Sequence, residues 1–377
     1  MRHLCSITQN FEKASNMKFI DEYRDKKLIS NILKKIDSLK LKYIPTLMEV
    51  CGTHTMAIFR NGIPKLLEGK VNLISGPGCP VCVSPNSYLD RAIALSKNPN
   101  HIITTFGDMM RVPGSTSSLE KAKASGADIR IIYSPLNAIK IAEENKDKKV
   151  IFLGVGFETT APTIAMTILE AKKKNIKNFF VLTSLKTIPP AMKILVDSKK
   201  LNIDGFICPG HVSVIIGAKA YEFISRDYKI PCVITGFEPF DIVQGIYMLL
   251  NQISNAKAKV EIQYNRAVNY EGNTKAQEIM SDVFEPSDAD WRGIGTIKNS
   301  GLKINDEYKE FDAINIKIAV ELTKEAKGCI CGDVLKGIKK PSECKLFRKV
   351  CNPMNPIGAC MVSTEGTCAA YYKYSEK

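Results

Sequence analysis

Cysteine is the residue type that points most directly to chemistry in this chain. The 377 residues include 12 cysteines, at positions 5, 51, 79, 82, 208, 232, 329, 331, 344, 351, 360 and 368. Six of them fall within the last 49 residues. The N-terminal sequence MRHLCSITQNFEKASNMK has no apolar core, so we expect no export leader and no need for structural disulfides. A dense group of cysteines in such a chain indicates metal binding or thiol redox chemistry.

The C-terminal cysteines are spaced as in an iron–sulfur site. Fourteen residues separate Cys329 from Cys344, and six separate Cys344 from Cys351. A further sixteen lie between Cys351 and Cys368. Four thiolates on loops are the usual ligands of a cubane iron–sulfur cluster. Tetrahedral zinc, which is normally bound by two closely spaced pairs, is the alternative, and the open spacing argues against it.

Cys79 and Cys82 form a CxxC motif in a turn rich in Gly and Pro, where we expect a helix to begin. The N-terminus of a helix lowers the pKa of a thiol, and this spacing permits a reversible disulfide. Half of a zinc site is the alternative, although no second compact CxxC stands nearby to complete it.

Cys51 and His54 stand three residues apart directly after an expected strand. A thiolate and an imidazole at one point suit iron or zinc. The CxxH spacing alone fits equally well a small buried cysteine beside a helix-capping Thr-His pair, so both interpretations stay open at this point.

Three more polar residues follow expected strands. Glu158 and Glu238 each come after a Gly-Phe pair, and a carboxylate there would hold a ligating histidine, accept a proton or pair with Arg111. His211, in the sequence PGHVS, is either a hydrogen-bonded structural residue or part of the site.

The elements that must position these residues are short apolar strands. Eight apolar runs alternate with helical patterns, at residues 43–50, 71–76, 101–107, 128–134, 149–156, 178–184, 204–210 and 231–237. Continuous apolar strands separated by helices indicate parallel sheets that are covered on both faces. The residues singled out above follow these runs, and functional groups gather at the carboxyl ends of parallel strands.

We expect an α/β protein with two similar, Rossmann-like parallel-sheet domains of four strands each, at 45–135 and 136–250. A highly charged segment, AEENKDKK, precedes the fifth run and favours a boundary there. A third domain would combine 1–44 with 251–377. In it, a Lys-rich amphipathic helix within residues 19–42 would pack on the irregular, cysteine-rich C-terminal segment, which a metal centre would hold together.

Composition and motifs exclude several classes of function. Lys and Arg total 53 against 39 acidic residues, but the lysines are scattered and not interleaved with aromatic residues, so we expect no nucleic-acid partner. An acidic protein partner stays open. The chain has neither GxGxxG nor GxxxxGK[ST], which argues against nucleotide binding. No apolar run is long enough to span a membrane, and we expect a cytoplasmic protein without membrane contact.

Six motifs, in this order, resemble those of the hydrogenase maturation (formation) protein HypD family. They are MEVCGTHT at 48–55, SGPGCPVC at 75–82, TTFGDMMRVPGS at 104–115, GFETTAP at 156–162, PGHVS at 209–213 and GFEP at 236–239. The tail is also similar to the family's cluster motif, Cys-x14-Cys-x6-Cys-x16-Cys, and to its ending, GACMVSTEGTCAAYY at 358–372. The resemblance covers nearly the whole chain and implies two α/β domains plus a cluster domain.

The resemblance also implies a role in building the active site of [NiFe] hydrogenase. The chain would form a scaffold with the small chaperone HypC and carry an iron with two cyanides and one carbon monoxide, Fe(CN)2CO, for the hydrogenase large subunit. Cyanide would come from HypE, which HypF serves. Cys51, assisted by His54, would ligate the iron together with the N-terminal cysteine of HypC. Cys79 and Cys82 would be redox-active, and a [4Fe-4S] cluster would be held by Cys329, Cys344, Cys351 and Cys368.

Three functions therefore compete at this stage. The first is a redox-supported scaffold that has no stand-alone turnover, with Glu158 and His211 also in its site. The second is a cluster-fed thiol–disulfide oxidoreductase that acts without partners. The third is a structural zinc protein. The roles of Cys331 and Cys360 stay unassigned.

Overall fold

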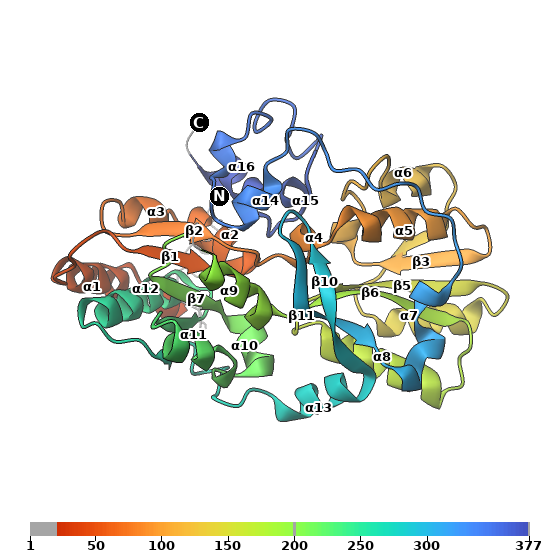
Figure 1. The fold of residues 1–377 in the computed structure, drawn as a ribbon, viewed down its shortest axis with the longest axis horizontal. Coiled ribbons are helices and arrows are strands. Elements are labelled where there is room, and N and C mark those ends of the chain that lie inside the picture. The colour runs from red at the N-terminus through yellow and green to blue at the C-terminus, as the bar shows by residue number, and fades with distance from the viewer. Residues whose placement is uncertain (1–20, 199–200, 376–377) are drawn as a thin grey trace, which may run out of the picture.

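The strands of the computed structural model, which describes residues 21–198 and 201–375, form two separate sheets (Figure 1). The first has five parallel strands in the order β2 (Asn72–Ser75), β1 (Thr46–Glu49), β7 (Gly205–Pro209), β8 (Cys232–Thr235) and β9 (Val260–Ile262). The second has six, in the order β10 (Phe284–Trp291), β11 (Gly295–Ile304), β6 (Phe179–Lys186), β5 (Lys149–Gly156), β3 (His101–Thr105) and β4 (Ile129–Ile131). Its last four strands are parallel, and β10 and β11 form an antiparallel hairpin on β6.

All eight expected strands are present, as β1 to β8. Most of them, such as β5 and β7, are runs of residues that are buried almost throughout, whereas β2 and β4 are partly exposed. The predicted grouping of these strands into consecutive halves, 45–135 and 136–250, is wrong. The first sheet takes β1 and β2 from one half and β7 and β8 from the other, whereas β3 to β6 build the second sheet. The chain thus leaves the first sheet and returns to it.

Helices connect and cover the strands. The longer ones are α1 (Lys26–Asp37), α2 (Gly52–Arg60), α5 (Asn86–Ser96), α7 (Leu136–Glu144), α8 (Ala161–Lys173), α9 (Ile188–Asp197), α10 (Gly210–Ile216), α12 (Pro239–Ser254), α13 (Thr274–Val283) and α16 (Thr367–Tyr374). The short ones are α3 (Ile63–Leu66), α4 (Pro80–Val83), α6 (Leu119–Ala124), α11 (Glu222–Asp227), α14 (Cys331–Leu335) and α15 (Ala359–Val362). Among the helices described, none combines the length and apolar character needed to cross a membrane.

The prediction that the N-terminal helix α1 packs on the cysteine-rich segment is wrong, because α1 packs on α12. The Asp25 side chain caps the start of α1 by accepting a hydrogen bond from the Lys27 N–H, at 2.7 Å. Its apolar stripe, with Ile32 and Ile36, is buried in the same cluster as residues of α12, among them Ile246 and Leu250. The amphipathic pattern fixes which face of α1 is buried, but it does not specify the partner.

Residues 251–327 do not belong to a third domain either. Strand β9 extends the first sheet, and the β10–β11 hairpin extends the second. Only the part after residue 327 is irregular and rich in cysteine, with α14, α15 and α16 as short helices. These helices lie together above the region between the two sheets, and the tip of the β10–β11 hairpin points toward them (Figure 1). One buried core cluster includes residues of both sheets and of this segment, such as Phe206, Leu153 and Cys360.

Replacing Ile36 with Ala tests the placement of α1. Ile36 is 3% exposed, so Ile36→Ala should lower the free energy of unfolding in urea by about 2–5 kcal/mol. Leu28 lies on the same helix and is 40% exposed, so Leu28→Ala should lower the free energy of unfolding by less than about 1 kcal/mol. Equal effects of the two substitutions would contradict the packing of α1 on α12.

Candidate functional site

Cys51 lies at the carboxyl end of β1 and is the N-cap residue of α2. Its backbone N–H donates to Glu49 Oε2 at 3.0 Å, and the Gly52 N–H donates to the Gly78 carbonyl at 2.9 Å. A Cβ on Gly78 would stand 2.1 Å from the Cys51 nitrogen. Only glycine therefore allows the loop before the CxxC motif to lie directly on Cys51.

The Cys51 sulfur faces the start of α2. The nearby backbone N–H groups of His54 and Thr53 lower its pKa and so favour a thiolate. Burial acts in the opposite direction and dominates, since it raises the pKa of Cys51 to about 12, with smaller contributions from Glu365 and Glu49. Without a metal, Cys51 is therefore a protonated thiol at neutral pH, and a bound metal ion would have to displace that proton.

His54 is fully buried, and its neighbours fix its tautomer. Nε2 lies 2.9 Å from both the Gly236 carbonyl oxygen and Thr235 Oγ1. A carbonyl only accepts, so Nε2 carries the proton and Nδ1 keeps its lone pair. Nδ1 has no hydrogen-bond partner among the described residues. Burial lowers the pKa of His54 to about 4, which keeps the imidazole neutral at physiological pH.

His54 and His211 share an aromatic neighbour. The ring of Phe237 stacks on His54 at a centroid distance of 4.6 Å and on His211 at 4.0 Å. The ends of β1, β7 and β8, which are neighbours in the first sheet, therefore bring these three rings together, as expected for parallel strands. His54 is enclosed by this stack, whereas His211 is exposed.

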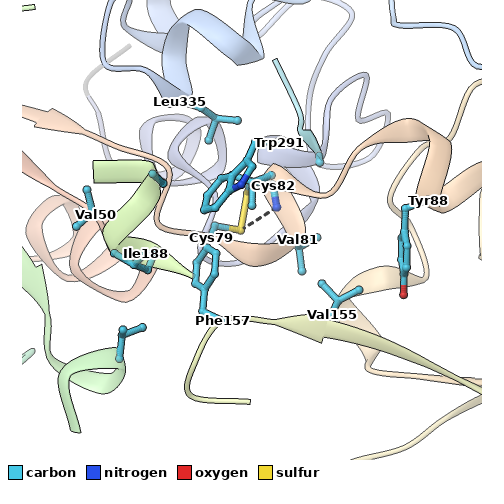
Figure 2. Packing of buried hydrophobic residues seen from close by; sticks show 14 of the residues in the cluster. Val50, Cys79, Val81, Cys82, Tyr88, Val155, Phe157, Ile188, Trp291 and Leu335 are labelled. Carbon is cyan, nitrogen blue, oxygen red and sulfur yellow. Dashed lines mark hydrogen bonds between the residues drawn. A yellow bond between two sulfur atoms is a disulfide. The ribbon is translucent and has the colours of Figure 1, made fainter. Parts of the chain in front are cut away.

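Cys79 and Cys82 are joined in a disulfide at the start of α4, a bond that their spacing permits. That the pair is redox-active stays a prediction. Both cysteines are buried, at 3% and 0% exposure. The Cys82 N–H donates to the Cys79 sulfur at 3.2 Å. Figure 2 shows the disulfide beside the rings of Trp291 and Phe157. These two rings stack on each other, with their centroids 6.0 Å apart. The pair thus lies in a dry, aromatic environment.

Residues 363–366 of the tail, here called the 363–366 loop, contact both sulfur sites. The Ser363 hydroxyl lies 3.3 Å from the Cys79 sulfur. Thr53 Oγ1 donates to Glu365 Oε1 at 2.6 Å, and a Cβ on Gly52 would stand 2.5 Å from Glu365. Sequence reasoning did not find this role, although the signal was available as STEG within the tail motif.

All six C-terminal cysteines surround one small cavity. Its walls are apolar, with Leu346, Phe347 and Met361 among them, and its cysteines are Cys329, Cys331, Cys344, Cys351, Cys360 and Cys368. The backbone N–H of Ile357 donates to the Cys351 sulfur at 3.4 Å. A set of thiols in an apolar cavity, with N–H···S hydrogen bonds, fits an iron–sulfur cluster chemically. No group of three His, Cys, Asp or Glu within 21–198 and 201–375 already has the geometry of a metal-ion site, so the fit rests on this donor set.

Cys331 and Cys360 add a feature that the spacing did not reveal. Their sulfur atoms lie 2.9 Å apart, and both residues are buried. They come from α14 and α15, which are separated by the loops that carry Cys344 and Cys351. A long-range pairing of this kind leaves no trace in the local sequence.

Among the described residues Arg111 pairs with neither Glu158 nor Glu238, as one of the suggested roles of these carboxylates required; its carboxylate neighbour is Glu120, at 3.9 Å. Arg111 donates to the Pro353 carbonyl oxygen at 2.6 Å and so holds the loop after Cys351. Glu238 instead pairs with Arg24, at 2.6 Å. These contacts are structural, and neither Glu238 nor Arg111 contacts His54 in the described part of the chain.

Glu158 remains a candidate for chemistry. It is 2% exposed, and its Oε1 accepts the Ile188 N–H at 2.9 Å. Its Oε2 has no hydrogen-bond partner among the described residues. Burial raises the pKa of Glu158 to about 7, so this carboxyl can hold or release a proton near neutral pH.

Comparison with known proteins gives matches that cover nearly the whole chain. Residues 26–375 match the family model described as "HypD: Hydrogenase formation hypA family". The chain is 46% identical over 374 residues to the hydrogenase maturation factor HypD of Azotobacter vinelandii, covering 96% of this chain and 98% of that protein. It is 44% identical over 369 residues to the factor of the same name from Escherichia coli K12, covering 96% of this chain and 99% of that protein.

The buried state of Cys51 predicts how its alkylation depends on pH. In reduced protein purified without partners, the rate with iodoacetamide should rise about tenfold per pH unit between about pH 7 and 10, because the thiolate fraction grows in that proportion below the pKa. In urea, the alkylation rate of the same thiol should stop rising above its ordinary pKa of about 8.5. Mass spectrometry of the Cys51 peptide measures both rates. A native profile that levels off near pH 9 would contradict the burial.

Proposed function

Because the chain belongs to the HypD family of hydrogenase formation proteins, we propose that it is the scaffold on which the Fe(CN)2CO group of [NiFe] hydrogenase is assembled. Its role as a hydrogenase maturation factor follows from the family; the scaffold and its chemistry are the proposal. The observation that carries it is that the 363–366 loop contacts both the Cys79–Cys82 disulfide and the start of α2, where Cys51 and the neutral His54 lie.

The iron is the cargo in this proposal, and Cys51 is its ligand. A soft thiolate suits the low-spin ferrous ion that cyanide and carbon monoxide favour. The N–H groups of Thr53 and His54 stabilise the Cys51 thiolate once its proton has left. His54 supports the site with the unshared lone pair on Nδ1, which is free to bind the metal.

The resident cofactor is a [4Fe-4S] cluster, and Cys329, Cys344, Cys351 and Cys368 would hold it. All four line the cysteine cavity and match the spacing of the family motif. When bound, the cluster supplies single electrons. The Cys79–Cys82 disulfide takes two electrons and two protons when it opens to two thiols. Glu158, whose pKa lies near neutrality, can supply one of these protons; it follows Phe157, which packs in the same core cluster as both cysteines.

Two partners complete the scaffold. A HypC-type chaperone would supply its N-terminal cysteine as a further iron ligand, and HypE, served by HypF, would deliver cyanide transiently. The hydrogenase large subunit would receive the product indirectly. These assignments rest on the family and on the chemistry of Cys51, and a cytoplasmic location is part of the same proposal.

A cluster-fed thiol–disulfide oxidoreductase is the alternative, and the disulfide itself is the observation in its favour. This function predicts that Cys79 and Cys82 reduce a soluble disulfide without partners and that Cys51 is dispensable. The burial of both sulfurs argues against it, because thiol–disulfide exchange requires direct attack on an accessible sulfur.

Infrared spectroscopy of the complex tests the scaffold. Protein purified without oxygen together with its HypC partner should show bands of metal-bound cyanide and carbon monoxide, and Cys51→Ala should remove them. Cys232→Ala is the matched control, because Cys232 is equally buried but lies within β8. Unchanged bands in Cys51→Ala would remove Cys51 from the ligand set.

Iron and acid-labile sulfide contents test the cofactor separately. The purified chain should be brown and contain about four irons and four sulfides. The Cys344→Ala variant should lose most of its iron and sulfide, because a thiolate ligand is missing. The Cys232→Ala variant should keep its iron and sulfide. A colourless protein with stoichiometric zinc would support the structural zinc site and contradict the cluster.

A further inference from the structure

Arg292 is a buried cation at the tip of the β10–β11 hairpin. The side chain is 6% exposed. Its Nε donates to the Ser84 carbonyl oxygen at 2.8 Å, and its backbone N–H donates to the Val83 carbonyl oxygen at 2.9 Å. Arg292 therefore holds the end of the short helix that carries the CxxC motif.

These contacts leave part of the guanidinium unused. Nη2 of Arg292 is buried without a hydrogen-bond partner, and no carboxylate pairs with Arg292 among the described residues. The nearby buried cation Lys186 differs, because Asp290 acts on it as a charged neighbour. Burying a guanidinium without an anion is strongly unfavourable, so its retention calls for negative charge close by.

The neighbouring backbone shows where that charge would be. Gly293 lies directly against Gly332, since a Cβ on Gly293 would stand 2.3 Å from the Gly332 Cα. The residues that precede these two glycines are Arg292 and Cys331. Cys331 lines the cysteine cavity. The hairpin tip thus places the buried Arg292 next to a residue that lines this cavity.

We propose that Arg292 is the counter-charge of the cysteine cavity and that it raises the reduction potential of the cluster held there. The inference rests on the proposed function for the presence of a cluster. Four thiolates give a [4Fe-4S] cluster a net negative charge, which grows by one unit on one-electron reduction. A fixed cation in a low-dielectric interior stabilises the more negative state, so it makes reduction easier.

Potentiometric titration tests this positioning role. Wild-type protein and Arg292→Met are titrated with dithionite under argon, and the electron paramagnetic resonance signal of the reduced cluster gives the midpoint potential. Arg292→Met should shift the midpoint to a more negative value. Arg292→Lys, which keeps the charge, should stay closer to wild type. Lys345→Met is the matched control and should leave the midpoint unchanged, because Lys345 is exposed beside Cys344 and water screens its charge.

The contrary outcomes are distinct. Equal midpoints for wild type and Arg292→Met, with iron and sulfide contents intact, would overturn the inference. So would an equal shift in Arg292→Met and Arg292→Lys, or loss of the cluster in Arg292→Lys, since either would indicate a structural role. Loss of the cluster in Arg292→Met and Arg292→Gln but not in Arg292→Lys would support the counter-charge. A wild-type chain without iron and sulfide would refute the proposed function instead.

Discussion

Two glycines allow the sulfur sites to approach each other, and much of the structure follows from the contacts they make. Gly78 lets the CxxC loop lie on the backbone of Cys51, and Gly52 lets the 363–366 loop lie on the start of α2. The tail then reaches Cys79 through Ser363 and Thr53 through Glu365. Because Cys368 follows only two residues after this loop, the cysteine cavity is tied to the same region.

Burial has opposite consequences for the groups in this region. It raises the pKa of Cys51 and lowers that of His54, so both are neutral before a metal arrives. It also places the Cys79–Cys82 disulfide among aromatic side chains, away from soluble thiols. Groups that are neutral and enclosed in this way are protected from side reactions, and they depend on a partner or a metal ion to become reactive. This combination suits the proposed scaffold, whose chemistry would begin only within a complex.

The sequence predicted the local features of the fold and missed the long-range ones. The strands were found because an apolar run such as 149–156 is a local property. Their distribution between two sheets was predicted wrongly, since the pairing of β1 with β7 joins segments about 160 residues apart. The partner of α1 was wrong for a related reason, because an apolar stripe fits any apolar surface of suitable shape.

The candidate site shows the same division. Cys51, His54 and the CxxC pair were identified from residue types that follow strands, and the parallel sheet brings Cys51 and His54 together with Phe237 and His211. The close approach of Cys331 and Cys360, and the position of Arg292, depend on how the β10–β11 hairpin meets the tail. Spacing along the chain carries no information about such contacts.

The central claim is that the tail encloses an iron–sulfur cluster beside a separate thiol site. Anomalous diffraction at the iron absorption edge, from crystals grown without oxygen, tests it most directly. The account predicts one compact iron peak inside the cysteine cavity, next to Cys329, Cys344, Cys351 and Cys368. Absence of iron from this cavity, or an anomalous signal there that appears only at the zinc edge, would contradict it.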